Sequence, residues 1–426
     1  MATPQHVLII GGGLGGPALA VALARRNIRS SIYELRSEPG DIGGALMLAP
    51  NALRVLDQLI GVYEPVRSSG YVLQRVTAYA SDGMKLGEVG LGEEKDNGYP
   101  AVRIRRPALH KVLLEECAKH GVTIQYGKKL ERIEETDDGV AAFFADGTSA
   151  TGAHSPSHLV LTAGDILVGA DGIHSKVREH VLGPAAPTAT YSGLCGIGGT
   201  LPLSQIRTPP GYHFPAFIYT SAGMLMAMPV DPEGQIIGWA SQETVPDKGR
   251  QGWAEYQRSG EAARAAKKTY QGVTHEPIRS IMDGIVDDHV NLWAPYELPD
   301  LPTWHTERVC LMGDAAHAIP PYGGQGSAQA FEDAGYLARL LESQDAVAKG
   351  YDKVFAKFEK VRKDRFQHVR DITAASGSTR RGSGPGLAWT FRKWATKGYF
   401  WFKGGVLRDT RITGYDVQAE DISVEA

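Results

Sequence analysis

The sequence predicts an α/β protein in which a parallel sheet with its helices is interleaved with a mainly antiparallel sheet and followed by a helical C-terminal region. Three observations support this prediction. An apolar strand, a glycine-rich turn, a helix and a second strand fill residues 7–34. Two further apolar strands, at 166–168 and 309–312, each run into a Gly/Asp pair. Between them, residues 185–293 carry short alternating strands separated by turns.

The glycine-rich turn at the N-terminus has the spacing of a dinucleotide site. The strand Val7–Ile10 runs into a G-x-G-x-x-G pattern, and a helix begins near Pro17. Glycine in this pattern allows a tight turn and lets the backbone approach a pyrophosphate, which the helix N-terminus attracts. We therefore expect a Rossmann-like βαβ unit here. The residues of the turn that we expect to contact the cofactor are Gly11, Gly13, Leu14, Gly15 and Gly16.

An acidic residue completes this pattern. The second strand, Ser31–Tyr33, ends at Glu34, about 20 residues after the glycines. A carboxylate at this point can accept hydrogen bonds from the ribose hydroxyls of an adenosine, so the pocket favours FAD or NAD over NADP.

Composition narrows the class of protein. The chain has 426 residues, a hydrophobic fraction of 42% and a formal charge of −3, which predicts two interleaved or sequential domains and no attraction for nucleic acid. Its three cysteines form no CxxC pair, which argues against a disulfide scaffold or a zinc site, and no metal is expected. The chain runs directly into a strand, and no apolar run reaches the ~18–20 residues that span a bilayer. A cytoplasmic protein is expected.

The order of patterns divides the chain into four parts. Residues 1–184 are predicted to form the first part of the dinucleotide domain with a hairpin insertion, 185–300 a substrate-binding β-sheet domain, 301–345 the return to the first domain, and 346–426 a helical region. A loop is expected at 377–386. The remaining predicted elements are helices at 51–59 and 106–120, strands at 122–126, 130–134, 140–144, 216–219, 224–228 and 236–240, and a turn at Asp146-Gly147.

The segment 308–334 carries a second candidate site. Its strand ends at Gly313-Asp314, and a loop with prolines and glycines then leads into a helix. Such a loop lets backbone N–H groups approach a ligand, and the Asp314 carboxylate can accept hydrogen bonds from hydroxyl groups of that ligand. A strand–loop–helix connection with a structural Asp314 is the alternative. The third element in this set is the strand 166–168, which is followed by Asp171-Gly172.

In the order G-x-G-x-x-G, Asp-Gly, Gly-Asp, the chain resembles the single-component FAD-dependent monooxygenases of the para-hydroxybenzoate hydroxylase-like family, which includes salicylate hydroxylase-like and zeaxanthin epoxidase-like enzymes. The resemblance covers Val7 to about Leu341. It implies that the glycines bind the FAD pyrophosphate and that Glu34 binds the adenosine ribose. It also implies that Asp171 takes part in handling both FAD and the nicotinamide nucleotide, and that Asp314 binds the ribityl hydroxyls. The further residues that it implies for FAD are Gly44, Ala45, Arg106, Pro321, Gly324, Gly326 and Ser327.

The resemblance also implies a reaction. NADPH or NADH would reduce FAD, and O₂ would add at the flavin C4a. The resulting hydroperoxide would then hydroxylate or epoxidise an aromatic or polycyclic small molecule, with secondary metabolism as one setting. An FAD oxidoreductase that inserts no oxygen is the alternative. No catalytic side chain and no oligomeric state are predicted.

Two departures from the family pattern bear on the substrate. Relatives that hydroxylate phenols carry an arginine where this chain has Gly198, and Ala328 stands where asparagine is usual. The substrate is therefore not expected to be a simple phenol.

Other conspicuous residues have open roles. Met224, Met226 and Met228 share a strand face and either line a substrate pocket or fill the core. His317 is expected to pack and order its loop, and the aromatic tail at 380–411 either caps the FAD domain or meets a membrane or partner. The candidate pocket walls are Phe214, Tyr219, Trp239 and Tyr296, and the histidines expected at the surface are His110, His120 and His275.

Overall fold

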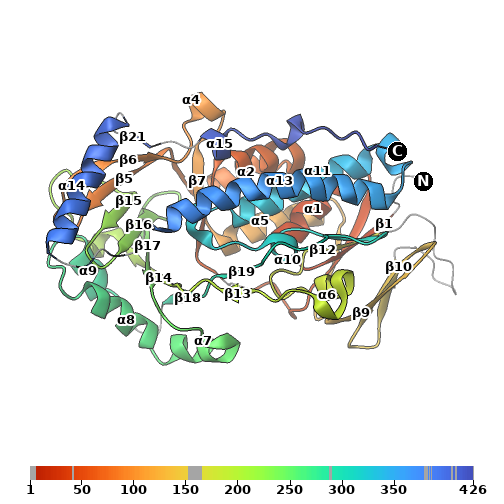
Figure 1. Ribbon diagram of the computed structural model, residues 1–426, viewed down its shortest axis with the longest axis horizontal. Helices are drawn as coiled ribbons and strands as arrows, with labels where there is room; N and C mark the ends of the chain where they lie inside the picture. The colour runs from red at the N-terminus through yellow and green to blue at the C-terminus, as the bar shows by residue number, and fades with distance from the viewer. Residues whose placement is uncertain are drawn as a thin grey trace.

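The computed structural model describes residues 6–40, 43–151, 166–286, 290–378, 382, 384, 386–403, 406–407 and 410–425. The molecule is elongated (Figure 1). Helix α14 (Leu387–Phe402) lies at one end and the hairpin of β9 (Leu130–Thr136) and β10 (Gly139–Phe144) at the other. The long helix α13 (Tyr351–Ser378) runs along the middle of the molecule.

A five-stranded parallel sheet forms the centre of the first layer, as the sequence predicts. Its order is β20-β12-β1-β2-β8, and every neighbouring pair is parallel. All five residues of β1 are buried because helices cover both faces of a parallel sheet. The strands are β1 (His6–Ile10), β2 (Arg29–Tyr33), β8 (Thr123–Gln125), β12 (Ile166–Gly169) and β20 (Val309–Leu311).

The second large sheet has eight strands and extends beyond the predicted 185–300 segment. Its order is β18-β14-β17-β16-β15-β5-β6-β21, so strands from the first and last parts of the chain complete it. Most pairs are antiparallel, but β5 with β15 and β6 with β21 are parallel. The strands are β5 (Arg75–Ala80), β6 (Lys85–Gly90), β14 (Cys195–Pro202), β15 (Ala216–Tyr219), β16 (Met224–Pro229), β17 (Ile236–Glu243), β18 (Asn291–Trp293) and β21 (Val406–Leu407).

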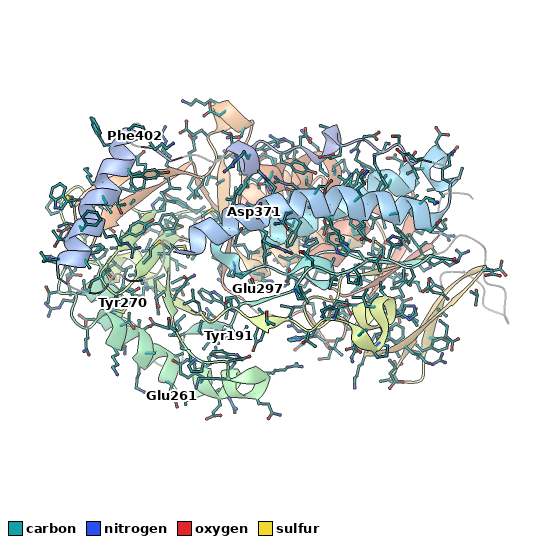
Figure 2. All side chains as sticks on the ribbon, viewed as in Figure 1. Tyr191, Glu261, Tyr270, Glu297, Asp371 and Phe402 are labelled. Atoms are coloured by element: carbon teal, nitrogen blue, oxygen red, sulfur yellow. The ribbon has the colours of Figure 1, made fainter. Side chains whose placement is uncertain are left out.

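Three small sheets complete the fold. The antiparallel sheet β3-β7-β4 is absent from the sequence prediction, because its strands are short and lie between helices. Strands β13 and β19 pair at the centre of the molecule, where Figure 2 labels Tyr191 and Glu297. The strands of the small sheets not yet given are β3 (Ala45–Leu48), β4 (Tyr71–Leu73), β7 (Ala101–Arg105), β11 (Ser149–Thr151), β13 (Thr190–Tyr191) and β19 (Tyr296–Glu297).

The helices follow the predicted pattern with three differences. Helices α7 (Gly249–Arg258), α8 (Glu261–Tyr270) and α9 (Ile278–Asp283) lie within 185–300, where the sequence predicts a sheet of strands and turns. The predicted helix at 51–59 is an α-helix only to Val55 and then a π-helical turn, η1 (Leu56–Ile60). The loop predicted at 377–386 falls partly outside the described residues, and α13 extends to Ser378. The other helices are α1 (Gly15–Ala24), α2 (Pro50–Val55), α3 (Tyr63–Ser68), α4 (Glu94–Asn97), α5 (Arg106–Lys119), α6 (Lys176–Leu182), α10 (Asp314–His317), α11 (Gly326–Glu342), α12 (Gln344–Val347) and α15 (Thr410–Thr413), with 3₁₀ turns η2 (Gly183–Ala185), η3 (Leu203–Gln205), η4 (Pro321–Gly323) and η5 (Val417–Ala419).

The described part of the aromatic tail does not pack on the parallel sheet. Helix α14 packs instead on β6 of the eight-stranded sheet, where the Phe400 ring lies against Gly87 and any side chain at 87 would collide with it. Most of its other large apolar side chains are exposed, and Figure 2 shows Phe402 at the outer edge of the molecule. Within the described part of the chain, no helix has both the length and the hydropathy needed to cross a bilayer.

Candidate active site

The glycines of the N-terminal turn are required for different structural reasons. Gly11 has φ +112°, and a Cβ there would lie 2.3 Å from the Ala170 carbonyl oxygen. A Cβ on Gly16 would lie 2.0 Å from the Gly11 carbonyl oxygen. The fold itself therefore requires glycine at both positions. At Gly13 the nearest atom, the Arg106 Nη2, would be 3.8 Å away, so this position leaves room for a ligand.

The first turn of α1 is open to an anion. No side chain caps this helix, and Leu14 precedes it with a helical backbone. Unpaired N–H groups at a helix start, together with the helix dipole, favour a phosphate. Glu34 lies beside the turn, because its Oε2 accepts a hydrogen bond from the Gly12 N–H at 2.7 Å and its Oε1 one from the Arg36 N–H at 2.9 Å.

Arg106 lies between the two predicted halves of the cofactor site. Its N–H donates to the Gly44 carbonyl at 3.0 Å, and a Cβ on Gly43 would lie 2.8 Å from its Cδ. Burial, with Arg36 nearby, lowers the pKa of Arg106, while Asp314 and Glu34 act in the opposite direction. The structure thus brings Glu34, Arg106 and Asp314 into one electrostatic neighbourhood.

The loop after β20 faces the same space. The Asp314 side chain is exposed, but it opens into the central cavity. Desolvation in this recess raises its pKa despite the neighbouring His317 and Arg106. Gly324 adopts φ +64°, and a Cβ there would lie 3.6 Å from the Met47 Cβ. No side chain caps α11, so the N–H groups from Gly326 and Ser327 onward offer a second donor set.

A fully buried ionic network supports this loop from behind. The Asp333 Oδ2 accepts from the Gly313 N–H at 2.7 Å and lies 2.6 Å from the His317 Nε2. Arg362 donates to the Asp333 Oδ1 at 2.7 Å and to the Glu332 Oε2 at 2.9 Å. His317 therefore orders the loop, as the sequence predicts. The network itself was missed, although two adjacent acids in the mainly apolar helical segment 331–341 are its signal in the sequence.

Two predicted positions lie differently from expectation. His110 is not a surface residue, because its Nε2 lies 2.7 Å from the Gly12 carbonyl oxygen and the side chain lines the cavity. Phe214 does not line the cavity and packs on Tyr212 with ring centroids 5.6 Å apart. The hydrophobic periodicity of the sequence could not predict either position, because both depend on contacts with elements that are distant in the chain.

Asp171 uses its carboxylate locally. Its oxygens accept from the Ser175 hydroxyl at 2.5 Å, the Lys176 N–H at 2.7 Å and the Val177 N–H at 3.2 Å, at the start of α6. Burial raises the pKa of Asp171, although these hydrogen bonds favour the charged form. The structure thus gives this carboxylate a capping role, and its predicted contact with the cofactor stays a prediction.

We expect Asp171→Ala to lower the free energy of unfolding by about 0.5–2 kcal/mol, because the Lys176 and Val177 N–H groups of α6 lose their acceptor while the Ser175 cap remains. Urea denaturation of the FAD-free protein measures this loss, and Asp171→Asn, which keeps one acceptor oxygen, serves as the matched control. Unchanged stability together with weaker FAD binding would instead assign Asp171 to the cofactor.

One continuous cavity extends from the predicted cofactor-binding residues to the eight-stranded sheet. Its volume is about 3390 Å³, several times that of a pocket for one small ligand. The glycine turn, Glu34, Arg106 and Asp314 line one part of it. The eight-stranded sheet lines the other part with Tyr219, Met224, Met226, Met228 and Trp239, and Tyr296 of β19 lines it as well. Uncapped helix starts, the open Gly13 position and this volume fit an extended dinucleotide such as FAD.

Comparisons with known proteins agree with this fit. The family model described as FAD binding domain matches residues 5–371. The 3-amino-4-hydroxybenzoate 2-monooxygenase PtmB3 of Streptomyces platensis is 31% identical over 80% of this chain and 80% of its own. The 6-hydroxynicotinate 3-monooxygenase of Pseudomonas fluorescens is 26% identical over 92% and 95%.

Solved structures share the fold. Klebsiella pneumoniae HpxO complexed with FAD and uric acid superposes with a TM-score of 0.75 at 23% identity, covering 96% of each chain. A salicylate hydroxylase substrate complex gives a TM-score of 0.75 at 22% identity, covering 98% of this chain and 97% of that one. The chain therefore belongs to the FAD-binding-domain family of FAD-dependent monooxygenases.

Proposed function

We propose that the protein uses NAD(P)H and O₂ to hydroxylate an aromatic small molecule, acting in the cytoplasm, where reduced nicotinamides are available. The observation that carries the proposal is the single cavity in which the glycine turn and the loop after β20 face an apolar wall of the eight-stranded sheet. The names of the sequence relatives support an aromatic substrate, since those proteins act on 3-amino-4-hydroxybenzoate and 6-hydroxynicotinate.

Different residues along the cavity would bind different parts of FAD. The α1 start would hold the FAD pyrophosphate, Glu34 the adenosine ribose, and Asp314 the ribityl chain. The backbone N–H groups at the start of α11 would stabilise negative charge on the reduced ring. The other residues proposed to contact FAD are Gly44, Ala45, Arg106, Asp171, Pro321 and Gly324. When bound, FAD supplies electron transfer from NAD(P)H and the activation of O₂.

The remaining residues would position substrate and exclude water. Met224, Met226 and Met228 form an adaptable apolar surface on β16, and Trp239 adds a flat aromatic face from β17. Such a wall holds a planar ring in place and keeps water from the reacting atoms. We also propose that the four-part division of the chain describes its domains, with β5 and β6 assigned to the substrate domain.

Isotopically labelled O₂ tests this function. The FAD-loaded protein is screened for aromatic acids that accelerate NAD(P)H oxidation, and the product is analysed by mass spectrometry. We expect one labelled oxygen atom in the product. NAD(P)H oxidation that yields a changed but unlabelled product would contradict the proposal and favour an oxidoreductase that inserts no oxygen.

A further inference from the structure

A buried arginine stands in the apolar part of the cavity wall. Arg103 lies on β7, where it is directly opposite Met47 of β3 and Tyr71 of β4. Residues directly opposite in an antiparallel pair share a face of the sheet, so the three side chains project together. Met47 and Tyr71 pack in a cluster with Phe217, Met226 and Met228. Arg103, which is only 5% exposed, therefore places a positive charge among apolar side chains.

Within the described part of the chain, this charge has no anionic partner. Its only hydrogen-bond acceptor is the Met226 sulfur, 3.8 Å from Nη1, and Nε has no partner. Burial lowers the pKa of Arg103 to about 10, and no nearby carboxylate opposes that effect. The guanidinium nevertheless stays charged at neutral pH. An unpaired charge at such a depth is costly, and an anionic ligand would offset that cost.

Arg103 lines the cavity close to the flavin loop, which is the predicted FAD-contacting segment 321–327. Met47, its cross-strand neighbour, has its Cβ 3.6 Å from the position of a Cβ on Gly324. On the other side, Nη2 would lie 3.8 Å from a Cβ on Gly238 of β17, so the charge lies close to the eight-stranded sheet. Arg103 thus reaches the part of the cavity between the flavin loop and the eight-stranded sheet.

Neither Gly198, where relatives carry an arginine, nor Arg106 can supply a cation to the substrate part of the cavity. At Gly198 a Cβ would lie 2.5 Å from the Trp239 carbonyl oxygen and 3.2 Å from the Trp293 ring, so packing excludes an arginine there. Arg106 lies with Glu34 and Asp314 in the cofactor part of the cavity. The charge on β7 is therefore placed for the substrate rather than for the cofactor phosphates.

We propose that Arg103 binds the carboxylate of an aromatic acid and so determines substrate class. A guanidinium matches a carboxylate in shape and can donate two parallel hydrogen bonds. The aromatic ring would then lie against the methionines of β16. This inference rests on the proposed function, because it assigns the substrate of the same cavity.

Paired ligands test the proposal. Salicylate, 3-amino-4-hydroxybenzoate and 6-hydroxynicotinate, each with its carboxamide, are titrated into the FAD-loaded protein, and binding is followed by the flavin absorption spectrum. We expect at least one acid to bind about tenfold or more tightly than its amide. Arg103→Met should reduce that ratio to about one, Arg103→Lys should retain part of it, and the exposed Lys111→Met should leave it unchanged.

A second measurement separates this role from a structural one. Because methionine suits the apolar cluster, Arg103→Met should unfold at the same temperature as the wild type or higher, with unchanged FAD affinity. A wild-type protein that prefers none of the acids, or a preference that survives in Arg103→Met, would overturn the proposal. The two proposals can fail separately. If Arg103→Met loses the carboxylate selectivity but the wild-type protein forms no product labelled from O₂, the proposed function is refuted and the anion site is retained.

Discussion

Arg362→Met is expected to lower the free energy of unfolding by about 3–5 kcal/mol, because it leaves two buried carboxylates without their shared cation. Arg362, Glu332 and Asp333 are all fully buried, and the guanidinium bonds both acids. Since Asp333 also holds the Gly313 N–H, we expect the loop at 313–327 to loosen and FAD to bind more weakly. Urea denaturation and FAD titration measure the two effects.

Lys360→Met is the matched control, because it removes an exposed cation from the same helix and should change stability by less than about 0.5 kcal/mol. An Arg362→Met protein as stable as this control would contradict the role of the network. Arg365→Met should cause an intermediate loss of stability, because Arg365 contacts Glu332 but not Asp333. Its Nε lies 3.2 Å from the Glu332 Oε2.

The same network predicts how stability depends on pH. Burial alone would raise the pKa of Asp333, but His317 and Arg362 outweigh it and lower the pKa to about 2. A carboxyl whose pKa is lower in the folded state than in the unfolded state, about 4, stabilises the protein above that pH. This contribution should be lost between about pH 4 and pH 2 and should shrink in Arg362→Met, as acid denaturation of both proteins measures.

Gly13→Ala is expected to weaken FAD binding by about tenfold or more while leaving the FAD-free fold intact. A Cβ at 13 meets no protein atom closer than 3.8 Å, so the substitution fills only the space proposed for the pyrophosphate. Equilibrium dialysis with FAD and thermal unfolding of the FAD-free protein separate the two effects.

Gly11→Ala and Gly16→Ala provide the contrast, because their Cβ atoms would collide with backbone carbonyl oxygens at 2.3 Å and 2.0 Å. Both should destabilise the FAD-free protein, whereas Gly13→Ala should not. Full FAD affinity in Gly13→Ala would refute the placement of the pyrophosphate at this turn.

The sequence alone was sufficient for the parallel half of the fold. The strand at 7–10, its glycines and Glu34 are local in the chain, and close approach of backbone atoms dictates glycine at 11 and 16. The same holds for β12 and β20, which are short apolar runs bounded by turn residues. Family membership followed from the order of these motifs, and the match over residues 5–371 confirmed it.

Only the tertiary structure decided the composition of the second sheet and the content of its cavity. Strands 75–80 and 85–90 join strands more than a hundred residues away, at 216–219 and 406–407, and such long-range pairing leaves no signal in local periodicity. The buried network likewise forms only when α11 and α13 pack. Arg103 reads in the sequence as one of three basic residues in RIRR, and only the pairing of β7 with β3 and β4 places its charge among apolar side chains. Local steric rules thus determine the cofactor turn, whereas the substrate wall depends on contacts between distant segments.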